Sequence, residues 1–266
     1  MNFSLIIINY QTLEITKNCL NSILSFCNSL EFEIILIDNN SGDGSIETLE
    51  KEFRGKIRII KNRENIGFAA ANNQGAKMAR GKYLFFLNSD TIITDNILAP
   101  LFKILEENKS TGILAPRLLN SDKSLQDKSY GAYPRLMDLI LSHFIKKEKI
   151  PSERTNSFEV DWLSGAALII RHELFKRIGG WDNKFFMYFE DVDLCRRTKD
   201  ANYKIIIAPS VSLIHLSGKS LSKNNKRKYY YYASQNYYFK KHYGLLSLLI
   251  LKIIRWPYKT ARKYKK

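Results

Sequence analysis

Residues 4–38 read SLIIINYQTLEITKNCLNSILSFCNSLEFEIILID, and this stretch decides the fold class. It opens on a short β-branched run from Ser4 to Asn9, which is typical of a strand buried on both faces. A second apolar run, Glu33 to Ile37, leads into Asp38. Between the runs, after Thr12 as the expected N-cap, apolar residues recur at helical spacing: Leu13, Leu20, Ile23, Leu24 and Cys27. The order strand, helix, strand predicts a parallel unit.

The same alternation continues through the first half of the chain. Helices are expected over residues 45–53 and 69–80, and strands over 57–60 and 83–87. Repeated units of this length predict an α/β fold with a doubly wound, mostly parallel sheet flanked by helices. In such sheets ligands bind at the carboxyl ends of the strands. The polar residues expected at that edge are Asn9, Tyr10, Asp38, Asn88, Ser89 and Asp90.

The second half is less regular in sequence. Proline residues interrupt residues 111–155, so that stretch is expected to lack a clear pattern of strands and helices. Short strands are expected again over 205–207 and 211–215. Because no boundary is visible before them, residues 1–218 are interpreted as one domain and residues 219–266 as a separate helical tail.

The net charge lies at one end of the chain. The 266 residues hold 42 Lys and Arg against 26 Asp and Glu, a formal charge of +16, while 45% are hydrophobic, as in a folded protein. Residues 219–266 carry 14 basic and no acidic residues, so the first 218 residues have a net charge of only +2. The apolar run 245–254 among these lysines predicts an amphipathic helix on an anionic membrane surface. A helix that packs on the domain with a solvated basic face is the alternative.

Cysteine usage and hydropathy indicate the compartment. Cys19, Cys27 and Cys195 are too few for a disulfide framework and favour a reducing environment. No stretch reaches the length of a membrane-spanning helix, and the short run 5–8 lacks the features of a signal peptide. The sequence therefore predicts a cytoplasmic protein, peripheral on the cytoplasmic face of the membrane.

Three acidic segments are candidates for chemistry. Asp38 opens a turn with Gly42 and Gly44, where it would accept hydrogen bonds from a nucleotide base or ribose, or form an Asx turn without a ligand. Asp90 follows an apolar strand, where it would hold a divalent cation or simply end the strand. Residues 190–193 crowd three carboxylates among aromatic rings, which suits a general base with a raised pKa. A solvated acidic face is the alternative.

Seven segments, taken in order, resemble the inverting glycosyltransferases of family 2, which have the GT-A fold, and are most similar to their rhamnosyltransferase-like group. They are IIINYQTLE, IDNNSGDGS, NIGFAAANNQGA, LFFLNSD, WLSGAALIIRHELFKRIGGWD, FFMYFEDVDLCRR and IHLSGKS, within residues 4–220. The resemblance implies an enzyme that moves a sugar, with inversion, from a nucleotide-diphosphate donor such as a dTDP- or UDP-sugar. It also implies a hydroxyl of a glycan or lipid-linked glycan as the acceptor.

The resemblance also implies roles for single residues. Asp191 corresponds to the catalytic base. Asp90 corresponds to the last Asp of a DxD-type motif that binds Mg2+ or Mn2+, with His215 as a further metal ligand, although Asn88 replaces the first Asp of the motif. The residues implied to contact the donor nucleotide are Asn9, Tyr10, Asp38, Asn65, Gly67, Asn73, Ser89 and Lys219. Those implied on the acceptor side are Trp162, Gly165, Trp181, Asp182 and Glu190.

Other function classes stay open on the sequence alone. The basic, tyrosine-rich tail would also suit a nucleic-acid-binding protein, whose bases stack on tyrosine rings, although no groove-reading motif accompanies it. A sugar nucleotidyltransferase would share a nucleotide-binding sheet, but INYQTLE stands where its glycine-rich loop would be. An inactive relative is the third alternative, because of Asn88.

Overall fold

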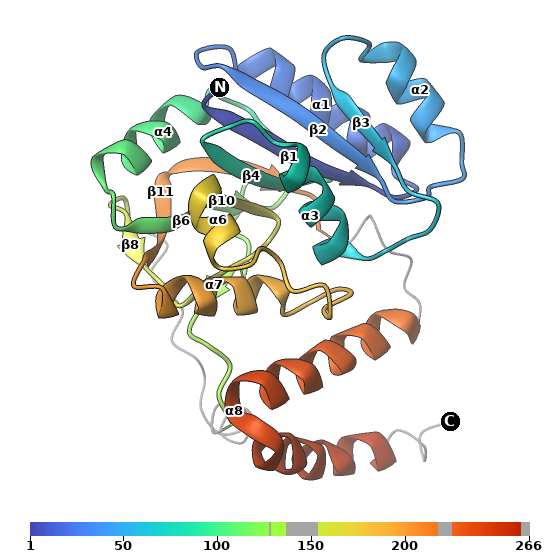
Figure 1. The fold of residues 1–266 in the computed structure, drawn as a ribbon, viewed down its shortest axis with the longest axis vertical. Coiled ribbons are helices and arrows are strands. Elements are labelled where there is room, and N and C mark those ends of the chain that lie inside the picture. Colours follow the sequence, from blue (N-terminus) through green and yellow to red (C-terminus); the bar gives the residue numbers. More distant parts are fainter. Residues whose placement is uncertain (128, 137–153, 218–224, 262–266) are drawn as a thin grey trace.

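The computed structural model describes residues 1–127, 129–136, 154–217 and 225–261. Within these residues nine strands form one sheet with helices on both faces (Figure 1). The strand order is β3-β2-β1-β4-β10-β6-β11-β5, and β8 pairs with β11 beside this path. The predicted α/β fold with a mostly parallel sheet is confirmed.

The first half of the chain follows the predicted alternation, with element ends shifted by one or two residues. Parallel pairing joins β1 to both β2 and β4, and β2 to β3. The elements are β1 (Phe3–Asn9), α1 (Leu13–Phe26), β2 (Phe32–Asp38), α2 (Ser45–Glu52), β3 (Arg58–Lys61), α3 (Phe68–Met78) and β4 (Tyr83–Asn88). Thr12 does stand at the N-cap of α1, but its hydroxyl donates to Asn9 Oδ1 at 3.1 Å and makes no capping hydrogen bond.

The second half completes the sheet and adds a long C-terminal helix. Its strands are β5 (Thr91–Ile92), β6 (Thr111–Leu119), β7 (Tyr130–Gly131), β8 (Phe158–Glu159), β9 (Trp162–Leu163), β10 (Ala167–Arg171) and β11 (Lys204–His215). Its helices are α4 (Leu98–Glu107), α6 (His172–Arg177), α7 (Glu190–Asp200) and α8 (Asn225–Ala261). β7 and β9 form a separate two-stranded sheet.

Two expectations for this half were wrong. The stretch expected to be irregular begins with β6, a strand of nine residues between β10 and β11. Pro116 pairs with Ala208, directly before the place where the pairing of β11 shifts register, between Ala208 and Ser212. Proline is tolerated at such an irregularity because the regular backbone hydrogen bonds, for which it lacks an N–H, are interrupted there. The two short strands expected over 205–207 and 211–215 are a single strand, β11, because the register shift between Ala208 and Ser212 lets the strand continue.

Each face of the sheet carries its own hydrophobic core. One core lies under α1, α2 and α4, and the other under α3, α6 and α7. Helix α3 approaches the sheet closely at Gly75, where a Cβ atom would lie 2.5 Å from Ile6 Cγ2. The buried alanines of α3 are Ala69, Ala71 and Ala76. The three cysteines are free and buried.

The C-terminal helix is bent and docks on the domain. At Gly244 the backbone leaves the helical region, with φ of 83° and ψ of 177°. The two halves of α8 fold back on one another (Figure 1), and Arg255 donates to Gln235 and Asn236. The first half buries Tyr238 and Phe239 in a third apolar cluster with Phe185. The described helices include none with both the length and the apolar character needed to cross a bilayer.

Candidate active site

The carboxyl ends of β1, β2 and β4 bring the first set of predicted site residues together. Asn9 pairs with Asp38 in register, and Ile8 pairs with Asn88. The Asn9 amide donates to Asp38 Oδ1 at 2.9 Å, while Asp38 also accepts from the hydroxyl and the N–H of Ser41. Asp38 is therefore buried and held by local hydrogen bonds, including one from the N–H three residues further along the chain.

The donor-side loop lies against the segment that precedes α7. Asn65 Oδ1 accepts from the N–H of Gly67 at 3.0 Å and from Asn39 at 2.8 Å. Gly67 has φ of +84°, and a Cβ atom there would lie 2.7 Å from the carbonyl oxygen of Phe186. That carbonyl accepts from the N–H of Phe68 at 2.8 Å. Only glycine fits here, because both the backbone angle and the close approach exclude a side chain.

Two of the predicted site residues, Asn73 and Trp181, make structural contacts within the fold. Asn73 donates to the Trp181 carbonyl at 2.7 Å and accepts from the Trp181 N–H at 3.0 Å. These two hydrogen bonds connect α3 to the backbone of Trp181. The Trp181 indole is 1% exposed and packs edge-on against Phe68 and Phe86. The Trp181 ring is therefore part of the hydrophobic core, although it was expected on the acceptor side.

Asp90 and His215 form the candidate metal pair. His215 Nε2 lies 3.2 Å from Asp90 Oδ1 and 3.5 Å from the Asn88 amide nitrogen. Both side chains are largely buried, and they come from the ends of β4 and β11. Ser89, between Asn88 and Asp90, is buried with its hydroxyl 3.5 Å from that of Thr12.

Gln126 fixes the orientation of the His215 ring, and sequence reasoning missed it. The Gln126 amide nitrogen faces three oxygens, of His215, Ser217 and Asn120, so its oxygen must be the atom 2.7 Å from His215 Nδ1. Nδ1 then carries the proton, and Nε2 of a neutral ring presents a lone pair towards Asp90. No signal in the sequence identifies Gln126, because it lies in an irregular loop 89 residues before its partner.

The chemistry of this pair fits a divalent cation. A lone pair and a carboxylate that face one another repel, and either a proton on Nε2 or a cation between them removes the repulsion. Carboxylate oxygen is the ligand that Mg2+ and Mn2+ prefer, and imidazole is a common metal ligand. Among the described residues no three His, Cys, Asp or Glu side chains cluster to hold a metal. A cation at Asp90 and His215 would therefore complete its shell with water and with oxygens of a bound diphosphate.

Asp191 lies in the first turn of α7, against the backbone of the turn between β9 and β10. Its Oδ2 accepts from the Gly165 N–H at 3.1 Å. Burial raises the pKa of Asp191, opposed by this hydrogen bond and by one from the Val192 N–H. Burial and the charge of Asp191 raise the pKa of Glu190 well above its usual value, and Glu190 Oε2 has no hydrogen-bond partner among the described residues. A carboxylate with a raised pKa is an effective base near neutral pH.

Residues 165 and 166 join the candidate base to the candidate metal pair. Gly165 holds Asp191, and the carbonyl of Ala166 accepts from the Asn88 N–H at 2.9 Å. A Cβ atom on Gly165 would lie 3.4 Å from the Phe68 ring and 3.6 Å from Asp191 Cβ. The structure thus brings Asp191 and the 88–90 segment to the same edge of the sheet.

The other predicted residues within the described ranges take no part in the hydrogen bonds given above. Trp162 is half-buried and donates to the Ala132 carbonyl at 3.0 Å. Asp182 accepts from two residues of α8, Tyr237 and Lys241. Tyr10 is half-buried directly after β1. Lys219 lies outside the described residues.

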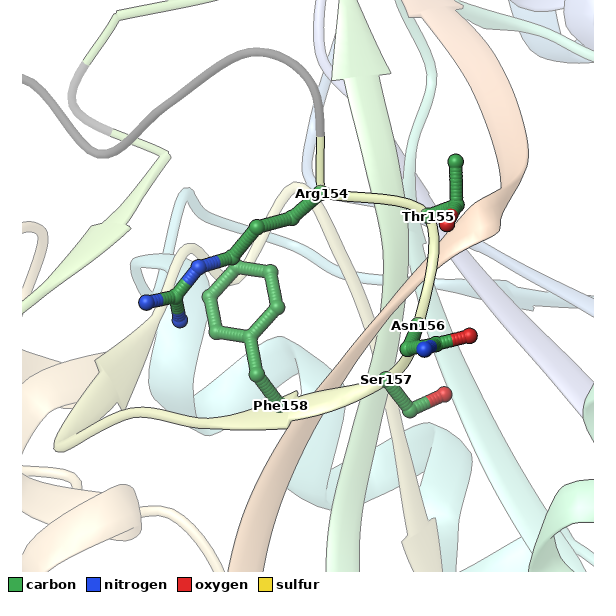
Figure 2. Close-up of a pocket in the computed structure, with 5 residues that line it drawn as sticks. All are labelled: Arg154, Thr155, Asn156, Ser157 and Phe158. Carbon is green, nitrogen blue, oxygen red and sulfur yellow. The ribbon is translucent and has the colours of Figure 1, made fainter.

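A pocket elsewhere on the surface carries no such chemistry (Figure 2). It is lined by a single short segment: Arg154, Thr155, Asn156, Ser157 and Phe158. The guanidinium of Arg154 lies 5.0 Å from the centre of the Phe158 ring. With neither a carboxylate nor an imidazole in its lining, the pocket offers no general base and no metal ligand.

The family model for glycosyl transferase family 2 matches residues 4–179. The chain belongs to this family. Rhamnosyltransferase WbbL of Escherichia coli (strain K12) is 33% identical over 159 residues, which cover 56% of this chain and 60% of the relative. An N-acetylglucosaminyl-diphospho-decaprenol L-rhamnosyltransferase of Mycobacterium tuberculosis (strain H37Rv) is 26% identical over 226 residues, 76% of this chain and 72% of the relative. The resemblance inferred from the sequence is confirmed.

Solved structures of glycosyltransferases share the fold. GalNAc-T7, crystallised with UDP, GalNAc and Mn2+, superposes with a TM-score of 0.59 at 17% identity, over 81% of this chain and 44% of that one. Residues 1–349 of TarS from S. aureus, in complex with UDP, give a TM-score of 0.60 at 18% identity, over 80% of this chain and 60% of that one. The family match and the relatives do not favour the nucleic-acid-binding or nucleotidyltransferase alternatives.

Gln126→Met should weaken Mn2+ binding, because the freed imidazole loses the partner that fixes its tautomer. Removal of such an outer partner lowers metal affinity about 10- to 100-fold. Lys123→Met, at an exposed residue of the same loop, is the control and should keep near-normal affinity. Mn2+ titration of the full chain with UDP, followed by electron paramagnetic resonance, measures both. Equal affinity in the two variants would show that Gln126 does not orient a metal ligand.

Proposed function

We propose that the chain is an inverting glycosyltransferase, with Asp191 as its general base. The observation that supports this most is the bridge at residues 165 and 166, which ties Asp191 to the 88–90 segment at the carboxyl edge of the sheet. A base and a charge-neutralising site held at one edge are what a single displacement at a sugar carbon requires.

In the proposed reaction the acceptor hydroxyl loses its proton to Asp191 as its oxygen attacks the anomeric carbon of the donor. The bond from that carbon to the diphosphate breaks on the opposite face, so the configuration inverts. Asp90 and His215 would hold Mg2+ or Mn2+, which when bound neutralises the charge on the departing diphosphate. Asn9 and Asp38, which are hydrogen-bonded to each other, would bind the nucleoside. Asn65 and Gly67 would contact the donor from the neighbouring loop.

The relatives indicate the substrate classes. Both rhamnosyltransferases named above transfer a deoxyhexose, and the mycobacterial name specifies a diphospho-decaprenol acceptor. We therefore propose a dTDP- or UDP-sugar as donor and a glycan or lipid-linked glycan as acceptor for this chain. The domain would be residues 1–218, with the tail acting at the cytoplasmic face of a membrane.

Asp191→Asn should abolish transfer while the donor still binds, because the amide cannot accept the proton. We expect a loss of at least about 100-fold in kcat, the usual contribution of a general base. A thermal-shift screen of sugar nucleotides with Mn2+ first identifies the donor, since a bound ligand raises stability. Release of the nucleoside diphosphate then measures turnover.

Asp200→Asn is the matched control for that variant, because Asp200 is an exposed carboxylate at the other end of α7. It should behave as wild type. Wild-type turnover in Asp191→Asn would remove Asp191 as the base. A wild-type chain that releases no diphosphate from any bound sugar nucleotide would favour an inactive relative.

The second half of α8 supports the proposed membrane contact. Its exposed apolar residues recur at helical spacing along one stripe: Leu245, Leu246, Leu249, Ile250 and Ile253. Lys252 is exposed beside them, and no acidic residue occurs anywhere in 219–266. An apolar stripe flanked only by positive charge matches the interface of an anionic membrane.

A full-length variant with Leu246→Gln, Leu249→Gln and Ile253→Gln should lose binding to vesicles that contain phosphatidylglycerol. Wild type should bind such vesicles, and more weakly as salt rises, because each basic residue contributes about 1 kcal/mol near anionic lipid. Met78→Gln, at an apolar residue of α3 that is 48% exposed, is the control. Co-sedimentation measures the bound fraction, and equal binding of all three chains would contradict the proposal.

A further inference from the structure

The segment that leads into Asp191 has an unfavourable backbone. Residues 182–189, here called the base loop, end on two aromatic residues in the left-handed region, Tyr188 with φ of 71° and Phe189 with φ of 67°. Side chains other than glycine avoid this region because Cβ meets a carbonyl oxygen. Such a conformation persists only where surrounding contacts hold it, and it is common at functional sites.

The first half of α8 supplies those contacts. The Ser234 hydroxyl donates to the Met187 carbonyl at 2.7 Å, directly before the two left-handed residues. The Phe189 ring lies 5.4 Å from that of Tyr231 and 5.5 Å from that of Tyr238, between centroids. The tail therefore packs against the strained part of the base loop.

Charged residues of α8 join the two ends of the base loop. Lys241 Nζ lies 2.7 Å from Asp182 Oδ2 and 2.7 Å from Asp193 Oδ1. Asp182 is the first residue of the base loop and Asp193 follows Asp191 in α7, so one ammonium group spans the segment that carries the base. His242 Nε2 is 2.7 Å from Asp193 Oδ1, and Arg197 holds the other oxygen at 2.8 Å.

The buried carboxylate of Asp193 depends on these partners. It is completely inaccessible to solvent. Burial would raise its pKa, but the hydrogen bond from His242 and the charges of Arg197 and Lys241 lower it to about 2. Two of these three groups belong to the tail, so without them α7 would begin beside a poorly compensated buried charge.

We propose that α8 is part of the transferase site, with Lys241 and His242 as positioning residues that hold the base loop in place and thereby set Asp191 against Gly165. The inference rests on the proposed role of Asp191. It assigns the basic tail a task in sugar transfer that is separate from membrane binding.

The test compares Lys241→Met, Lys241→Arg and Lys240→Met in the full chain. Lys240 is the matched control, because it is exposed on the same helix and makes no ion pair within the described part of the chain.

Lys241→Met should lower kcat at least about 10-fold, the scale expected when a catalytic group is misplaced. The affinity for the donor nucleotide with Mn2+ should fall less than kcat, because Asn9, Asp38 and Asp90 lie at or beside the ends of β1, β2 and β4, away from the contact of Gly67 with the base loop. Lys241→Arg should restore most of the rate, and Lys240→Met should match wild type.

Hydrogen–deuterium exchange of residues 182–193 provides a measurement that does not need activity. Faster exchange there in Lys241→Met, but not in Lys240→Met, is expected even if the proposed reaction is wrong. Unchanged exchange together with unchanged kcat would overturn the inference, as would an equal loss of kcat and nucleotide affinity. Should Lys241→Met fail to fold, His242→Gln replaces it and is judged by the same criteria. Absence of turnover in wild type would count against the proposed function alone.

Discussion

The parallel register of β1, β2 and β4 is the constraint on which the site depends. Because Asn9 pairs with Asp38 and Ile8 with Asn88, the three strands end at the same edge and deliver their polar residues together. The other side of the site comes from the second half of the chain, where β11 ends at His215 and residues 165 and 166 link Asp191 to Asn88. One edge of one sheet thus gathers side chains that are up to 206 residues apart in sequence.

Part of the positive charge of the tail is used inside the protein and is not available to an anionic partner. Its basic residues fall into two groups, because the bend at Gly244 separates a half that docks on the base loop from a half with an exposed apolar stripe. In the docked half, Lys241 neutralises the buried Asp193 and is therefore not free for an anionic partner. The structure shows that the first half of α8 packs on the domain, which was the alternative interpretation of the tail, while membrane binding by the second half stays a proposal.

Sequence periodicity sufficed for the βα units, because a buried parallel strand is a continuous apolar run and its helix has a regular apolar face. It failed at β6 and β11, where proline suggested breaks that a register shift accommodates. Asp191, Gly165 and the pair Asp90–His215 were predicted as candidates because motifs carry them. Gln126 and Lys241 were not, since their roles depend on contacts across 89 and 48 residues that no local pattern encodes. Trp181 was expected to face a sugar, but only the packing shows that its ring is buried.

The most direct test of the central claim is a crystal structure of the full chain with Mn2+ and the nucleoside diphosphate of the donor. We expect an anomalous peak between Asp90 and His215 in contact with the diphosphate, and the nucleoside against Asn9 and Asp38. We also expect open space between the diphosphate and Asp191 that can hold a sugar. A metal and a nucleotide bound away from Asp90 and His215, or an Asp191 separated from the diphosphate by the protein itself, would contradict it.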